Sequence, residues 1–253
     1  MYRFDLVMTG FPGRSTEHGP LGWSTVGLLR GDGRTVLVDT GGPAYREPLL
    51  LGLRQRGVSA QDVTDVLITH CHWDHVSNFT LFPRARVTVP GAELDWAAAQ
   101  APGTWHLAEL HVARLASGTD DVVLAAPGQE VAPGITAVAT PGHTPGHFAY
   151  RATTADGEVV FAGDAVKNRL ELRTGEVDLT LDADESRRSI DALRHLVGSN
   201  PAATLLPGHD VPLRLAGGAV WPQAAVSAGV AALVDDTGEP TVIDLGRTPT
   251  TGG

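Results

Sequence analysis

His70-Cys71-His72-Trp73-Asp74-His75 is the stretch that decides the fold, and it directly follows the apolar run Val66–Thr69. An apolar run of this length is typical of a buried strand. In an extended chain His70 and His72 point to one side and Cys71 to the other, and a turn directly afterwards brings Asp74 and His75 beside them. Burying these polar groups together would be costly without a compensating cation. The stretch therefore indicates a metal site at the end of a strand.

Three further metal-binding side chains follow at long range, each in a glycine turn where an apolar run ends. They are His143 after Gly142, Asp164 after Gly163 and His209 after Gly208. Imidazole and carboxylate groups suit Zn²⁺, and one tetrahedral ion cannot use all of them. We therefore expect two metal ions, held by a set of five histidines and two aspartates: His70, His72, Asp74, His75, His143, Asp164 and His209.

Strand-like and helix-like patterns alternate twice along the chain. Helices are expected over Ala44–Arg56 and Ala92–Ala101 in the first series and over Asp184–Val197 in the second, which begins near Val122. Two such halves, about 1–118 and 119–215, predict one α/β domain. Its expected architecture is a four-layer αββα sandwich of two pseudo-symmetric halves, with the helices outside.

The C-terminal tail, residues 216–253, carries weaker signals. Small and apolar residues predict a last helix over Val220–Val234, and Pro240–Leu245 is expected to form an edge strand. We expect the final residues to be disordered.

The composition limits the kinds of molecule that the protein is expected to bind. With 19 basic and 29 acidic side chains the net charge is −10, and the basic residues form no run. Nucleic-acid binding depends on Lys and Arg, so it is not expected. No window approaches the roughly 18 uninterrupted apolar residues of a membrane span, and the single cysteine, Cys71, allows no intrachain disulfide. We expect a cytoplasmic protein that acts on a small molecule, with Cys71 as a packing residue.

The insert Gly91–Gly118 has an unusual composition, with Trp96, Trp105, His106 and His111 on two expected short helices. Aromatic residues at this spacing usually pack against a core. The other interpretation is a lid over the metal site, and the same insert is the expected contact if the protein forms a homodimer.

Taken together, the motifs resemble those of the metallo-β-lactamase superfamily. The resemblance rests on the H-x-H-x-D-H cluster, the Thr-Pro-Gly-His turn at 140–143, the Gly-Asp at 163–164, the Gly-His at 208–209 and the early segment 38–42, Val-Asp-Thr-Gly-Gly. It implies the αββα fold. It also implies that one metal is held by His70, His72 and His143, that a second is held by Asp74, His75 and His209, and that Asp164 bridges the two.

Within the superfamily, the chain is most similar to the acyl-homoserine lactonase and glyoxalase II-like branch. The spacings of 21 residues from His143 to Asp164 and 45 residues from Asp164 to His209 are like those of that branch. Its lactonases carry a tyrosine downstream of the bridging aspartate, where this chain has Lys167 and Asn168 instead. Either side chain is a candidate donor to a developing oxyanion; for Lys167 the alternative is a solvated loop position.

The resemblance implies hydrolysis at two Zn²⁺. Zinc lowers the pKa of a bound water to around 7, so a metal-bridging hydroxide would attack the carbonyl of a small ester or lactone. Asp74 and Asp164 are the expected catalytic residues, with Asp74 passing a proton to the leaving group. The alternatives are one Fe²⁺ in a mononuclear persulfide dioxygenase, or a thioester or β-lactam hydrolase of the same fold.

Residues around the ligands are candidates for orienting them or for touching the substrate. Asp39, Thr69, Thr144 and His147 are candidates to fix ligand imidazoles, and His147 ranks first because it repeats the Pro-Gly-His turn four residues after His143. The candidates for contact with the substrate, besides Lys167 and Asn168, are Trp73, Trp105 and His106.

Overall fold

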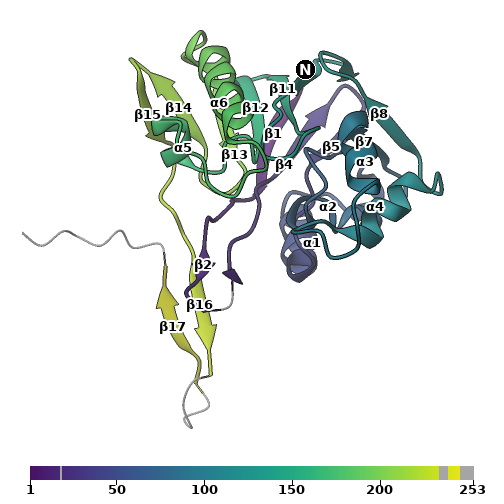
Figure 1. Ribbon diagram of the computed structural model, residues 1–253, viewed down its shortest axis with the longest axis horizontal. Coiled ribbons are helices and arrows are strands. Elements are labelled where there is room, and N and C mark those ends of the chain that lie inside the picture. The colour runs from purple at the N-terminus through teal and green to yellow at the C-terminus, as the bar shows by residue number, and fades with distance from the viewer. Residues whose placement is uncertain (18, 234–238, 246–253) are drawn as a thin grey trace, which may run out of the picture.

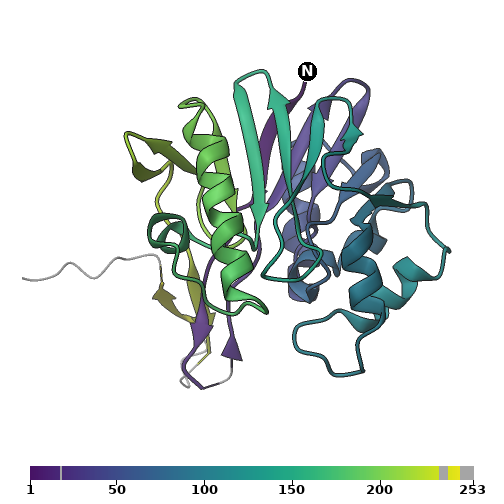
Figure 2. The same ribbon diagram turned by 45° about the horizontal axis from the view of Figure 1, so that its top comes forward.

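Two sheets lie face to face between two sets of helices in the computed structural model, which describes residues 1–17, 19–233 and 239–245. Helices α1 to α4 lie on one side of the molecule and α5 and α6 on the other (Figure 1). Turning the molecule brings α6 in front of the second sheet (Figure 2). This is the expected αββα arrangement.

The first sheet has six strands in the order β1 (Arg3–Met8), β4 (Val26–Gly31), β5 (Arg34–Val38), β6 (Asp65–Leu67), β7 (Arg86–Pro90) and β8 (Val122–Ala125). The second has seven, in the order β15 (Ala219–Pro222), β14 (Leu213–Ala216), β13 (Thr204–Pro207), β12 (Gly157–Gly163), β11 (Phe148–Thr154), β10 (Ile135–Ala139) and β9 (Glu130–Ala132). Two small hairpins complete the strands, β2 (Arg14–Ser15) with β3 (Gly19–Pro20) and β16 (Gly229–Ala232) with β17 (Thr241–Asp244).

The helices are α1 (Arg46–Gln55), α2 (Trp73–Val76), α3 (Gly91–Ala98), α4 (Glu109–Ala116), α5 (Arg169–Thr174) and α6 (Ala183–Gly198), with short 3-10 turns at Pro43–Tyr45, Ala60–Asp62 and Phe79–Leu81. The longest, α6, has 16 residues, and none of the described helices is long and apolar enough to cross a membrane. Asp182 caps α6 by accepting hydrogen bonds from the backbone of Asp184 and Glu185.

Three apolar layers hold the four structural layers together, because strands buried on both faces send successive side chains to opposite sides. Val36 and Val38 of β5 pack in the central layer between the sheets, whereas Leu37 packs outward, in the cluster that contains Leu49 and Leu53 of α1. A third cluster joins the second sheet to α6. The chain thus has a helix–sheet core on each side and a sheet–sheet core in the middle.

The chemistry-bearing turns all follow strands that run in the same sense within their sheet. β5 and β6 are parallel in the first sheet, and β12 and β13 are parallel in the second. Ligand sites of α/β sheets lie at the carboxyl ends of such strands. The segments after β6, β12 and β13 carry His70, Asp164 and His209, so one edge of the sandwich collects donors from both sheets.

Two boundaries differ from expectation. The strand expected over Asp121–Leu124 was to begin the second half, but the strand observed there, β8, pairs in parallel with β7 and completes the first sheet, so the sheets divide between Ala125 and Glu130. The helix expected over Val220–Val234 is wrong: β15 pairs with β14 and β16 pairs with β17. The strand expected over Pro240–Leu245 is present as β17, and the tail after Leu245 lies outside the described residues.

The insert Gly91–Gly118 divides into two packed helices and one loop. Leu94 of α3 and Val112 and Leu115 of α4 are buried in the outer core of the first sheet. Both helices are therefore part of the body of the domain. The loop between them carries Trp105 and His106 to the mouth of the site.

Candidate metal centre

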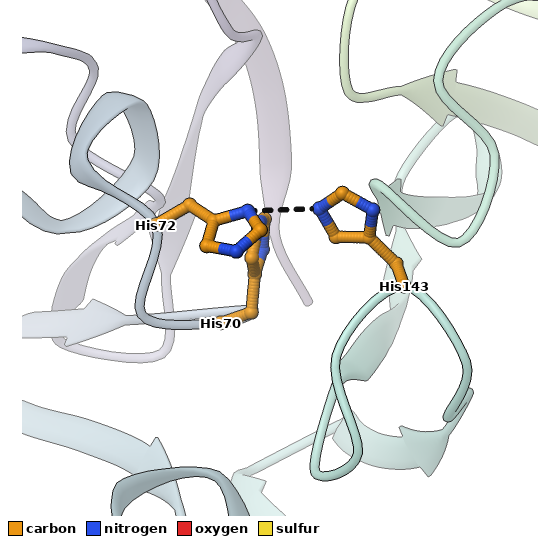
Figure 3. Close-up of side chains that lie close together, drawn as sticks. All are labelled: His70, His72 and His143. Atoms are coloured by element: carbon orange, nitrogen blue, oxygen red, sulfur yellow. Dashed lines mark hydrogen bonds between the residues drawn. The ribbon is translucent and has the colours of Figure 1, made fainter. Parts of the chain in front are cut away.

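The first group of donors consists of three imidazoles, from His70, His72 and His143. One nitrogen from each ring lies within 4.8 Å of the others. His70 and His72 follow β6, and His143 reaches them from the turn between β10 and β11 (Figure 3). His143 Nε2 lies 3.0 Å from His72 Nδ1, a separation that one zinc ion about 2.1 Å from each nitrogen can bridge.

The second group consists of Asp74, His75 and His209, whose donor atoms also lie within 4.8 Å of one another. Asp74 and His75 belong to the single turn of α2, which begins directly after His72. His209 Nε2 lies 3.3 Å from Asp74 Oδ2, and His75 Nε2 lies 3.6 Å from the same oxygen. The turn of α2 thus brings the carboxylate of Asp74 and the imidazole of His75 close to the imidazole of His209.

Asp164 stands between the two groups. Its Oδ2 lies 3.3 Å from His143 Nε2, while its Oδ1 lies 3.3 Å from both His75 Nε2 and His209 Nε2. The carboxylate needs a glycine beside it, because a Cβ on Gly208 would collide with Asp164 Oδ1. The structure therefore brings all seven predicted donors to one place, with one carboxylate facing both groups.

Unpartnered buried atoms show that these residues fit divalent cations. Within the described chain, His70 Nε2, His75 Nε2 and Asp164 Oδ1 are buried without a hydrogen-bond partner. Leaving such groups unpaired in a protein interior is costly, and a cation contacting these atoms removes the cost. The donor set of imidazole nitrogen and carboxylate oxygen is the set that zinc prefers.

Hydrogen bonds on the far side of the rings select the nitrogen that faces the site. His143 Nδ1 donates to the carbonyl oxygen of Leu179 and His209 Nδ1 donates to that of Trp23, each over 3.0 Å. A carbonyl only accepts, so Nε2 of both rings keeps its lone pair for a metal. His72 is the exception, because it presents Nδ1.

Asp39 connects two of the candidate ligands to the end of β5. Its Oδ2 lies 2.8 Å from His75 Nδ1, and it accepts from the backbone and the hydroxyl of Thr69. Thr69 Oγ1 in turn lies 3.0 Å from His70 Nδ1. Asp39 and Thr69 therefore contact ligand rings as expected.

The other two orienting candidates act elsewhere. His147 Nε2 accepts from the backbone N–H of Asp164 at 3.1 Å, and its Nδ1 lies 2.8 Å from Thr140 Oγ1. Burial lowers the pKa of His147 to about 3, which keeps it a neutral acceptor. His147 thus positions the main chain of Asp164 and not the ring of a candidate ligand, and Thr144 Oγ1 is buried without a hydrogen-bond partner in the described structure.

The two groups differ in their electrostatics. Burial lowers the pKa of His72 to about 4 and holds the pKa values of His70 and His143 well below the ordinary value. Burial alone would lower the pKa of His75 and His209 too, but the charges of Asp74 and Asp164 outweigh it and raise both. The first group is a neutral imidazole cluster, and the second is a mixed cluster rich in negative charge.

Glu93 is a buried residue near the site that sequence reasoning missed. From α3, its Oε1 accepts from the backbone of Cys71 at 2.9 Å and its Oε2 from that of Gly146 at 3.2 Å. Burial raises its pKa to about 7. One side chain thereby joins the His70–His72 segment to the 143–147 turn. The available signal was an acid next to Leu94 on the inward face of a helix.

A cavity of about 420 Å³ opens onto the metal-binding residues. Its walls are mainly apolar, and the lining residues include Phe11, Trp73, Trp105, His106, Lys167, Asn168 and Leu179. All five candidates for substrate contact therefore line the pocket. Cys71 does not: it is fully buried in the outer core of the first sheet, as expected of a packing residue.

Lys167 and Asn168 are both committed to structure at the pocket wall. Lys167 is not a solvated loop residue, because it is buried and its Nζ lies 2.9 Å from Glu171 Oε1. Asn168 caps α5, its Oδ1 accepting from the backbone of Leu170 and Glu171. The ion pair engages the ammonium group of Lys167, whereas the cap uses only the acceptor oxygen of Asn168 and leaves its Nδ2 hydrogens able to donate.

Comparison with known proteins places these motifs in a family. The chain matches the family model described as the metallo-beta-lactamase superfamily over residues 20–209. It is 34% identical over 196 residues to metallo-beta-lactamase domain-containing protein 1 of Xenopus laevis, covering 76% of this chain and 72% of that protein. The protein of the same name from Homo sapiens is 35% identical over 188 residues, covering 71% of this chain and 59% of the relative. The chain thus spans about three fifths of the human relative's length.

Solved structures share the fold at lower identity. An N-acyl homoserine lactone hydrolase with N-hexanoyl-L-homoserine bound at its catalytic metal centre superposes with a TM-score of 0.65 at 20% identity, covering 83% of this chain and 93% of that one. A dizinc quorum-quenching lactonase gives a TM-score of 0.67 at 16% identity and covers 79% of each chain. At these identities the likeness shows the fold alone.

Proposed function

The chain belongs to the metallo-beta-lactamase superfamily, and from this premise we propose that it is a dinuclear zinc hydrolase of small esters or lactones. The observation that carries the proposal is the position of Asp164. One of its oxygens faces His143 of the first group and the other faces His75 and His209 of the second, each at 3.3 Å. A carboxylate placed in this way suits two cations that share it.

Two bound zinc ions would supply a solvent-derived nucleophile at neutral pH and polarise the substrate carbonyl. The chain's own contribution is to hold the donors still: His75, His143 and His209 are each fixed by a hydrogen bond from Nδ1. Asp74 lines the pocket with a carboxylate that is partly exposed. It is therefore placed to carry a proton from the site to the leaving group.

The pocket supports a small substrate with an apolar acyl group. A volume of about 420 Å³ is in the range of small-molecule sites. Phe11, Trp73, Trp105 and Leu179 supply apolar surface around the metal-binding residues. The likeness in fold to two lactone hydrolases adds support for a lactone, and for zinc in the case of the dizinc enzyme.

The iron alternative fits the donors less well. A mononuclear iron dioxygenase needs one facial set of two histidines and a carboxylate, with open positions. Here a second group is assembled in full around Asp74, with His75 Nε2 buried and unpartnered in the described structure. This arrangement favours two cations. A thioester or β-lactam hydrolase would use the same metal donors. Assays with different substrates are therefore needed to distinguish these activities from hydrolysis of an ester or a lactone.

Metal content and a substrate panel test the proposal. Protein purified without added metal or chelator should contain about two zinc ions per chain by elemental analysis. It should hydrolyse aryl esters or lactones with apolar acyl groups faster than thioesters or a chromogenic cephalosporin. About one iron per chain, with oxygen uptake on addition of a thiol persulfide, would overturn the assignment. The cytoplasmic location and the homodimer stay predictions from the sequence.

A further inference from the structure

We propose that His106 donates a hydrogen bond from Nε2 to the carbonyl oxygen of the substrate, and that Trp73 fixes the tautomer that makes it a donor. The inference rests on the proposed hydrolysis. It assigns a substrate-binding role to a histidine outside the metal ligands, on the loop between α3 and α4. It also gives the indole of Trp73, within the metal-binding hexapeptide, a function besides packing.

Two hydrogen bonds hold His106 against Trp73. The indole Nε1–H donates to His106 Nδ1 over 3.0 Å, and the backbone N–H of Trp73 donates to the carbonyl oxygen of His106, also over 3.0 Å. A bridge between His72 and Leu107 extends the pairing by one residue. The loop is therefore docked on the hexapeptide in a single register.

The indole contact decides where the proton of the imidazole lies. An indole nitrogen only donates, so His106 Nδ1 must be the unprotonated nitrogen, and the proton of the neutral ring is on Nε2. His106 lines the pocket, and its Nε2 has no hydrogen-bond partner in the described part of the protein. Because Nδ1 accepts the hydrogen bond from the indole, the ring is neutral and its Nε2–H is the donor.

The backbone of His106 supports a functional interpretation. Its φ is +58°, in the left-handed region that non-glycine residues adopt at a cost. The ring centroid of His106 lies 5.8 Å from that of His72, a donor of the first group. A substrate carbonyl at the first group would thus meet the neighbouring His106. His106 is thus a donor at the pocket wall in addition to Lys167 and Asn168.

Nitrogen NMR of protein labelled at histidine tests the tautomer directly. The wild-type protein should show His106 protonated at Nε2, and Trp73→Phe should convert it to a mixture of tautomers. The matched control Trp96→Phe, on α3 and packed against the outer core, should leave it unchanged. A wild-type ring protonated at Nδ1 would overturn the inference, because Nε2 would then be an acceptor.

Kinetics and binding test the contact with substrate. His106→Ala should keep its zinc and lose about 100-fold in kcat, as for other single oxyanion donors, and His106→Gln should recover part of the loss through its amide N–H. The control His111→Ala, on α4, should match the wild type. An effect below twofold for His106→Ala would show that the residue only supports the loop.

A phosphonate ester that mimics the tetrahedral intermediate separates this inference from the proposed function. Phenyl methylphosphonate should bind His106→Ala about tenfold more weakly than the wild type by calorimetry, whether or not any ester is turned over. Binding with no catalysis would overturn the hydrolase and leave the donor role supported. Equal affinity for both proteins, or none for the wild type, would overturn the donor role.

Discussion

The two donor groups of this centre are built from similar parts and behave differently. The first contains three imidazoles whose pKa values burial lowers, and the second places two imidazoles beside carboxylates that raise their pKa values. Asp164 faces both groups. A neutral cluster, in which burial lowers the imidazole pKa values, and a charged cluster, in which carboxylates raise them, thus lie side by side at one pocket.

Removing the shared carboxylate should disable both donor groups and have the largest effect. Asp164→Ala takes a donor from both groups and leaves the buried nitrogens of His75 and His143 without it, so we expect turnover to fall at least about 1,000-fold. Zinc content should fall below that of the wild type by elemental analysis. Glu176→Gln, an exposed acid on the α5–α6 loop, is the control. A fully active Asp164→Ala would contradict the dinuclear proposal.

Glu93 offers a pH test of the support behind the first group. Its pKa is raised from 4.5 to about 7 by burial, so the folded state binds this proton more tightly than the unfolded state. The resulting stability is present below pH 4.5 and is lost as the pH rises through about 7. Relative to Glu93→Gln, the wild type should lose about 3 kcal/mol of unfolding free energy over this range.

Denaturant unfolding of both proteins between pH 4.5 and 8, at equal zinc content, measures that difference. Metal ligands that titrate contribute equally to the two proteins, so they cancel. Parallel pH profiles for the two would show that Glu93 is ionised throughout. Glu47→Gln, on the exposed side of α1, should follow the wild-type profile.

Asp39→Asn should weaken metal binding at the second group more than at the first. Asp39 contacts His75 directly but reaches His70 only through Thr69. Loss of such a contact typically lowers metal affinity 10- to 100-fold. Titration with a chelator should therefore release one zinc ion early and the other late. Simultaneous release of both ions would contradict the proposal that Asp39 supports the second group more than the first. Asp32→Asn, at an exposed turn, is the control.

Cys71→Ala should have the smallest effect. Cys71 lies between two ligands in sequence but is buried in the outer core, and burial raises the pKa of its thiol well above the ordinary value. We expect turnover within twofold of the wild type, unchanged zinc content, and a loss of about 1 kcal/mol in unfolding free energy. A loss of zinc would show that a thiolate belongs to one of the groups.

Residues with a local pattern could be predicted, and residues that depend on distant contacts could not. All seven donors lie in short motifs at strand ends, so hydrophobic runs and glycine turns were enough to find them. Glu93 has no such pattern, since its role depends on Cys71 and Gly146, which lie 22 and 53 residues away. His106 was a candidate for substrate contact, but its tautomer depends on the approach of Trp73.

The secondary structure also divides into elements that a local pattern predicts and elements that depend on distant pairing. The helices over 46–55, 91–98 and 183–198 follow apolar periodicity and were expected. β8 pairs with β7 in the first sheet. The residue pattern of a strand predicts the strand but does not say which of two sheets it joins. In the tail, pairing of β15 with β14 and of β16 with β17 overrides the helical tendency of the small residues between Pro222 and Gly229.

The origin of the donors in both sheets has a consequence for the order of events in the cell. Residue 209 is synthesised 139 residues after residue 70, so the emerging chain displays the hexapeptide long before its last partner exists. The centre can close only when β13 has joined the second sheet and that sheet has docked on the first. If the centre binds metal as proposed, its loading would follow the docking of the two sheets and would be a late step in the synthesis of this chain.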